Sequence, residues 1–140
     1  MNALAEIEAR LLAMEPVLAQ SPVAMADELL DLGEQILCYW LAGKDASPTE
    51  AKVEGFRLLA LHRQGCKGDP SFNACRESCR ELAYHYNLLQ LEPEHPQIGA
   101  RIAMARAVAL HLCLFVGGKL QVPELGADCC SSTTLRTATA

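Results

Sequence analysis

The stretch AVALHLCLFVGG, residues 107–118, decides the fold class of this 140-residue chain. It carries no charged side chain, and His111 is its one strongly polar residue. At twelve residues it is shorter than the roughly 20 that a membrane-spanning helix needs. A helix that is apolar on all sides is surrounded by protein. We therefore expect a central helix over about 96–116, and we expect any face that the fold leaves uncovered to be a dimer interface.

The composition around this stretch is that of one folded helical domain. Hydrophobic residues make up 51% of the chain and charged residues 21%, which excludes a disordered protein. Alanine and leucine dominate, while aromatic residues contribute only 5%. Because alanine and leucine lose little entropy in a helix, this bias favours helices over sheets. A chain of this length buries a core without disulfide bonds.

Capping residues and prolines divide the chain into five predicted helices. Ser21-Pro22 is an N-cap followed by proline at the first helical position. The segment SPTE, residues 47–50, is a capping box and gives the strongest helix start in the sequence. The predicted helices cover about 3–19, 22–42, 48–64, 70–91 and 96–116. Short connections between them favour antiparallel neighbours in a single all-α helical bundle.

The two ends of the chain differ from this pattern. We expect the bundle domain to cover residues 1–125 and residues 126–140 to form a flexible, Ser/Thr-rich tail, because no hydrophobic period runs through them. Glu6 and Glu8 stand where a signal peptide carries basic residues, which favours a cytoplasmic protein. In the reducing cytoplasm the seven cysteines are expected to be thiols, so no disulfide framework is predicted.

His62, Cys66, Cys75 and Cys79 form the densest group of potential metal ligands. Thiolates and imidazoles are the ligands that zinc prefers, and four of them complete a tetrahedral site. Cys75 and Cys79 are four residues apart, so on a helix they share one face. The spacing H-x3-C-x8-C-x3-C nevertheless differs from the common zinc-finger spacings.

Core packing is the alternative for the two helical cysteines, and we favour it. They lie in the middle of an apolar stripe formed by Phe72, Cys75, Cys79, Leu82, Ala83, Tyr86 and Leu89. Cysteine is among the most buried residue types and packs as a small hydrophobe. In the predicted tail, Cys129 and Cys130 are expected to be accessible to oxidants. They are candidate redox residues, with ordinary thiol reactivity as the favoured alternative.

Charge is unevenly distributed along the chain. Residues 1–34 contain seven acidic residues against Arg10 alone, whereas residues 57–80 contain five basic residues against two acidic ones. Arg76 and Arg80, four residues apart on the predicted fourth helix, form a basic strip that suits a phosphate, a carboxylate or an acidic protein surface. The alternative, which we favour, is that this strip pairs with the acidic first two helices or is a solvated face.

The sequence contains none of the common catalytic motifs, and its net charge of -5 argues against nucleic-acid binding. We predict a small cytoplasmic, non-catalytic protein-interaction or regulatory module. It would bind a protein partner, or a second copy of itself, through Arg76 and Arg80 or through a hydrophobic helix face. No cofactor, nucleic acid or membrane partner is predicted. The alternative function is that of a thiol-based metal-binding or redox-sensing protein, with zinc or another thiophilic metal held by the His/Cys cluster.

Overall fold

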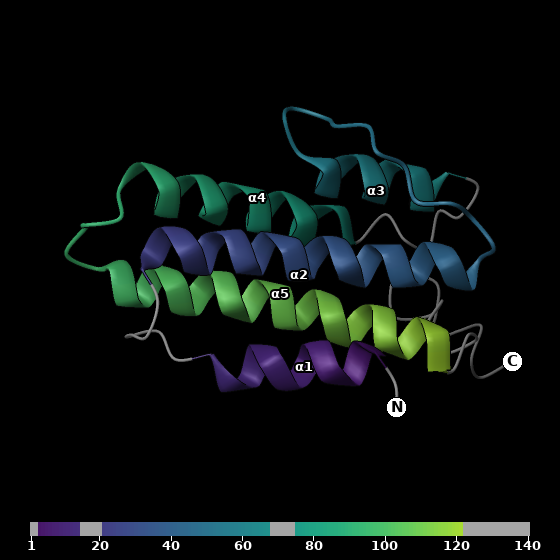
Figure 1. Cartoon of the computed structure of the whole chain (residues 1–140), viewed down its shortest axis with the longest axis horizontal. Helices are drawn as coiled ribbons and strands as arrows, with labels where there is room; N and C mark the ends of the chain where they lie inside the picture. The colour runs from purple at the N-terminus through teal and green to yellow at the C-terminus, as the bar shows by residue number, and fades with distance from the viewer. Residues whose placement is uncertain (1–2, 15–20, 68–74, 122–140) are drawn as a thin grey trace, which may run out of the picture.

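The computed structural model describes residues 3–14, 21–67 and 75–121, and the regular elements in these ranges are five helices (Figure 1). They are α1 (Ala3–Ala13), α2 (Pro22–Gly43), α3 (Arg57–Cys66), α4 (Cys75–Leu91) and α5 (Ile98–Gln121). This confirms the predicted all-α helical bundle. The predicted helical residues 15–19 and 70–74, the predicted tail 126–140 and the domain boundary before it lie outside the described residues.

Two parallel helices form the middle of the bundle. In Figure 1, α2 and α5 lie side by side and run in the same direction, while α1 and α4 run the opposite way. Helix α4 packs against both α2 and α5, and α1 packs mainly against α5. The shorter α3 contacts α2 and α4 at one end of the molecule.

Helix α2 begins where its capping signal predicts. The Ser21 hydroxyl oxygen accepts a hydrogen bond of 3.1 Å from the Ala24 backbone N–H, and Pro22 takes the first helical position. This cap satisfies one of the backbone donors that every helix start leaves unpaired. The helix ends at Gly43, close to the predicted end at residue 42.

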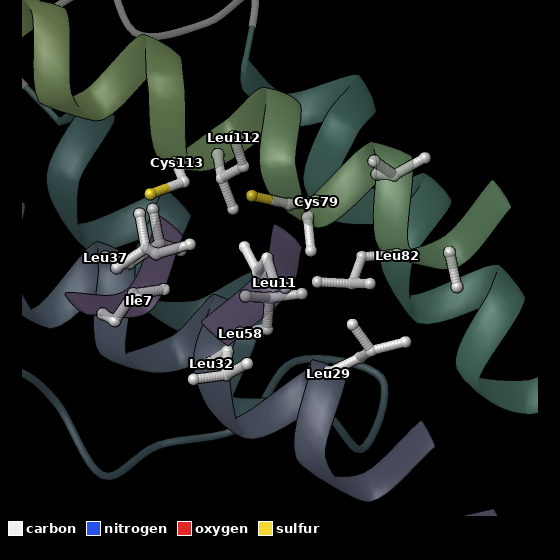
Figure 2. Close-up of a cluster of buried hydrophobic side chains, with 14 of the residues drawn as sticks. Ile7, Leu11, Leu29, Leu32, Leu37, Leu58, Cys79, Leu82, Leu112 and Cys113 are labelled. Atoms are coloured by element: carbon white, nitrogen blue, oxygen red, sulfur yellow. The ribbon is translucent and has the colours of Figure 1, made fainter. Parts of the chain in front are cut away.

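Aliphatic side chains from all five helices fill the interior. Leu11, Leu37, Leu58 and Leu112 are fully buried, and Figure 2 shows them converging with their neighbours on one cluster. Burying a leucine side chain contributes on the order of 1.5–3 kcal/mol. The core therefore holds α1 and α3 to the central α2, α4 and α5.

The predicted third helix is wrong over its first half, because residues 47–56 are not helical and α3 begins only at Arg57. Val53 and Phe56 exchange two backbone hydrogen bonds, of 3.0 and 2.9 Å, across Glu54 and Gly55. Both central residues have positive φ, 54° and 86°, as in a type I′ turn. A helix needs negative φ throughout, so this turn excludes a helix there.

The residues of the predicted capping box instead bind the end of α3. The Gln64 side-chain amide accepts from the Thr49 N–H at 2.8 Å and donates to the Ser47 carbonyl oxygen at 2.8 Å. The Thr49 hydroxyl accepts from the nearby Ala51 N–H. These hydrogen bonds satisfy backbone groups of Ser47 and Thr49 without a helix. They also hold this segment, and the turn that follows it, beside α3.

Helix α5 continues beyond its predicted end, through Gly117 and Gly118 to Gln121. The added turn brings Leu120 against the end of α2, since a Cβ atom at position 43 would lie 2.8 Å from Cδ2 of Leu120. Two glycines weaken a helix by about 1 kcal/mol each relative to alanine. Packing of the last turn against α2 offsets that cost.

Helix α5 is also less enclosed than the sequence predicts. It contacts α1, α2 and α4, yet Met104 and Leu114 are 53% and 55% exposed and His111 is exposed between them. The expectation of a helix buried on all sides is therefore wrong. From Ile98 to Gly118 the helix is long and apolar enough to cross a membrane, a property shared by core helices of soluble proteins. The cytoplasmic location stays a prediction.

Candidate functional site

A cavity of about 260 Å³ opens where α3, α4 and the 53–56 turn meet. We call it the arginine pocket, because three of its lining side chains are arginines. Its walls are formed by Val53, Leu59, His62, Arg63, Cys66, Arg76 and Arg80. The structure thus places the predicted Arg76/Arg80 strip in the same cavity as His62 and Cys66 from the predicted metal cluster.

Helical spacing explains why these side chains share one cavity. Residues three and four apart lie on one helix face, which puts Leu59, His62 and Cys66 together on α3. Arg76 and Arg80 share a face of α4 in the same way. His62 is buried, whereas Arg63 and Arg76 are exposed, so the cavity has a closed floor and a charged rim.

Glu54 places a carboxylate beside the pocket. Arg80 Nη2 donates to Glu54 Oε2 at 2.9 Å. That hydrogen bond and the charge of Arg80 lower the pKa of Glu54, with smaller contributions from the charges of Arg63 and Arg76. The carboxylate is therefore ionised at neutral pH and shares the field of all three arginines.

Arg63 and Arg76 differ from the other arginines of the described residues. Neither guanidinium has a hydrogen-bond or ion-pair partner within residues 3–14, 21–67 and 75–121. Arg80 donates to Glu54, and each of the remaining described arginines also has an oxygen partner: Arg10 has Glu28, Arg57 has Glu50, Arg101 has Glu92, and Arg106 has the Met14 carbonyl oxygen. Among the arginines that the structure describes, the two unpaired guanidinium groups therefore both line this pocket.

The two helical cysteines of the predicted metal cluster lie in the core. Cys75 and Cys79 are fully buried, and Figure 2 shows the Cys79 sulfur among leucine side chains. Burial raises the pKa of Cys79 to about 12, and the nearby Cys66 thiol adds to the rise. Zinc requires the thiolate, which this environment disfavours at neutral pH.

The rest of the predicted metal cluster does not complete a ligand set. In the described part of the chain, no group of three or more His, Cys, Asp or Glu side chains is arranged to hold a metal ion. His62 and Cys66 line the pocket, and the Cys66 thiol donates to the Arg63 carbonyl oxygen at 3.5 Å. Metal binding by these residues stays a prediction that the geometry does not favour. The redox candidates Cys129 and Cys130 lie outside the described residues.

His111 and Cys113 point in different directions, as their spacing predicts. The Cys113 thiol is buried and donates to the Leu4 carbonyl oxygen at 3.6 Å, and burial raises the pKa of Cys113 to about 11. The exposed His111 ring instead contacts the Phe115 ring edge to face, with centroids 4.2 Å apart. The pair therefore forms no common site.

The exposed side of α5 is the second candidate surface. An open groove of about 470 Å³ lies between α4 and α5, with Glu77 and Glu81 on one wall and His111 and Phe115 on the other. The exposed Met104 and Leu114 belong to the same helix. This groove is acidic and shallow, in contrast to the arginine pocket.

The sequence did not predict one pocket residue, Arg63, or the neighbouring Glu54 as part of the site. Arg63 belongs to the basic segment, but only the tertiary fold brings it beside Arg76. The expected helix over 48–64 was wrong at Glu54, so the sequence did not indicate that this side chain would lie beside the pocket. The one local signal for it is the pair Glu54-Gly55 between Val53 and Phe56, a weak form of the Asp-Gly hairpin turn.

No protein-family model, curated protein or solved structure matches this chain.

Proposed function

We propose that this protein is a non-catalytic interaction or regulatory module that binds an acidic segment of a protein partner in the arginine pocket. One observation carries the proposal: Arg63 and Arg76 line a cavity with no partner among the described residues, while the other described arginines are paired. A partner carboxylate or similar anion would satisfy these guanidinium groups.

The chemistry of arginine supports binding over catalysis. A guanidinium group remains protonated in proteins, so it offers no acid or base at neutral pH. Its planar set of N–H donors matches an anionic oxygen pair and forms charge-assisted hydrogen bonds. Three such groups around one cavity repel one another, so they do not stabilise the fold by themselves. Their common field would instead attract an acidic partner.

Paired charge reversals test the proposal. Arg76→Glu with Arg80→Glu replaces two positive charges of the pocket, and Lys52→Glu with Lys67→Glu makes the same change of charge at exposed residues that do not line it. Each immobilised protein is incubated with lysate, and bound proteins are identified after salt elution. We expect the wild type and the lysine variant to capture the same acidic partner and the arginine variant to lose it.

Circular dichroism and thermal melting of all three proteins check that each remains folded. Capture that is unchanged in the folded arginine variant would exclude the pocket as the binding surface. Equal loss in both variants would show that net charge alone, and no specific site, governs the interaction.

A further inference from the structure

We infer that the arginine pocket is specific for a phosphate monoester, carried by a phosphorylated side chain of the protein partner, with Arg63 and Arg76 as its direct ligands. This inference rests on the proposed function, because it names the chemical group that the same pocket takes. It follows from the number of positive charges in the pocket that lack a partner among the described residues, and from their positions on α3 and α4.

The first step is the charge count. Arg63, Arg76 and Arg80 carry three positive charges, and Glu54 pairs with Arg80. Two positive charges therefore remain without a partner in the described residues. A glutamate or aspartate of the partner carries one negative charge, so it would neutralise one of these positive charges and leave the other without a counter-charge. A phosphate monoester carries about −1.5 to −2 at neutral pH and matches both.

The second step is the number of acceptors. Arg63 approaches the cavity from α3 and Arg76 from α4, so their N–H donors reach it from two helices. A carboxylate has two oxygens in one plane and suits a single guanidinium fork. A phosphate monoester has three terminal oxygens in a tetrahedral arrangement, so it accepts from two forks on different elements at once. The cavity of about 260 Å³ exceeds one phosphate group and leaves room for the side chain that carries it.

The third step concerns Glu54, whose position is unusual for its residue type. A left-handed φ of 54° is adopted mainly by glycine, asparagine and aspartate, and strained backbone of this kind is concentrated at functional sites. The turn holds the carboxylate against Arg80. Glu54 is thus a positioning residue: it keeps the Arg80 guanidinium at the pocket wall and pairs with its charge.

Apolar side chains of the pocket favour a phosphorylated over an unphosphorylated partner segment. Val53 and Leu59 line the same cavity as the arginines. An apolar wall gives no hydrogen bond to an uncharged serine. An unphosphorylated partner segment would therefore gain little from entering the pocket.

The test compares three fluorescently labelled peptides of identical sequence, a serine flanked by glycine and alanine, in which the serine is unmodified, phosphorylated or replaced by glutamate. Fluorescence anisotropy with the full-length protein measures each dissociation constant, and inorganic phosphate is used as a competitor. We expect the phosphoserine peptide to bind at least about tenfold more tightly than the glutamate peptide, since one further charged hydrogen bond supplies that factor. The serine peptide is expected not to bind measurably.

Two matched variants assign the binding to the pocket. Arg63→Gln with Arg76→Gln removes the two unpaired charges and is expected to weaken phosphopeptide binding by at least about tenfold. Lys52→Gln with Lys67→Gln makes the same change of charge at exposed residues that do not line the pocket, and it is expected to weaken phosphopeptide binding by no more than about threefold. Glu54→Gln frees the Arg80 guanidinium, and because a positive charge attracts a dianion more strongly than a monoanion, it is expected to strengthen phosphopeptide binding at least as much as binding of the glutamate peptide.

The possible failures are distinguishable. Equal binding of the glutamate and phosphoserine peptides, lost in the arginine variant, overturns phosphate specificity and leaves the proposed function standing. Competition by inorganic phosphate at the concentration of the phosphopeptide makes free phosphate the ligand and overturns the assignment to a modified partner. No binding of any peptide overturns the inference, while capture by Arg76 and Arg80 in lysate still decides the proposed function.

Discussion

The aliphatic core and the arginine pocket both use side chains of α3 and α4, but they differ in whether those side chains have partners within the protein. In the core, side chains such as Leu37, Leu58 and Leu82 are buried against one another and account for the stability of the bundle. In the pocket, Arg63 and Arg76 line a cavity and have no partner in the described ranges. Truncating a core side chain is therefore expected to destabilise the fold, whereas replacing Arg63 or Arg76 is expected to leave its stability almost unchanged. The stability of the fold therefore gives no reason for Arg63 and Arg76 to line this cavity.

Truncating a central core residue should have the largest effect on stability. Leu37 is fully buried on α2, so Leu37→Ala is expected to lower the free energy of unfolding by about 3 kcal/mol, within the usual range of about 2–5 kcal/mol. Urea unfolding followed by circular dichroism measures the change. A loss of less than about 1 kcal/mol would show that the site is not tightly packed as described.

The next largest effect is expected where α3 packs against α2. Gly65 of α3 faces Trp40, and a Cβ atom at position 65 would lie 1.9 Å from Cζ3 of that ring. Gly65→Ala is therefore expected to cost about 1–3 kcal/mol of stability through overpacking. Gly99→Ala on α5 is the matched control, because a Cβ there has no neighbour within 4 Å. In thermal unfolding, the melting temperature of Gly99→Ala should equal or exceed that of the wild type, and that of Gly65→Ala should be lower. A melting temperature of Gly65→Ala above that of Gly99→Ala would contradict the packing of α3 against α2.

Substitutions of Cys79 test whether this residue packs in the core or binds a metal ion. As a core residue, Cys79 should tolerate alanine at a cost of about 1 kcal/mol and serine at about 1–3 kcal/mol, because a buried hydroxyl must find a hydrogen bond. Metal analysis of protein purified without chelator should give far less than one zinc per chain in every case. About one zinc per chain that disappears with Cys79→Ala would instead establish the metal-binding alternative.

The smallest effect on stability is expected in the pocket. Arg63→Gln with Arg76→Gln should change the free energy of unfolding by no more than about 0.5 kcal/mol, since the removed charges have no partner to lose among the described residues. Chemical unfolding beside the wild type measures the difference. A loss above about 1 kcal/mol would mean that these arginines support the fold, and the contrast between the two regions would fail.

Local signals account well for the helices of the core. Ser21-Pro22 at the start of α2 and the apolar stripe through Cys75, Cys79 and Leu82 on α4 depend on residues close in sequence, and both predictions are confirmed. The end of α5 depends instead on the contact between Leu120 and α2, which no local pattern of residues 117–121 indicates. The predicted end of this helix at residue 116, directly before Gly117 and Gly118, is therefore wrong.

The pocket could be predicted only in part, because it is built from non-local contacts. Arg76 and Arg80 share a helix face, so their spacing indicates the basic strip. Arg63 and Glu54 reach the same place only after residues 47–56 leave the helical path and Gln64 holds them against α3. The capping box at 47–50 is a sound local signal that tertiary hydrogen bonds override.

Mapping where an anionic ligand binds tests the central claim most directly. Backbone amide resonances of the isotope-labelled full-length protein are followed while the phosphoserine peptide is added. We expect the shifted resonances to cluster around the arginine pocket, at Val53, Glu54, Arg63, Cys66 and Arg76. Shifts confined to the exposed side of α5, around Met104 and Leu114, or no shifts at all, would contradict this expectation.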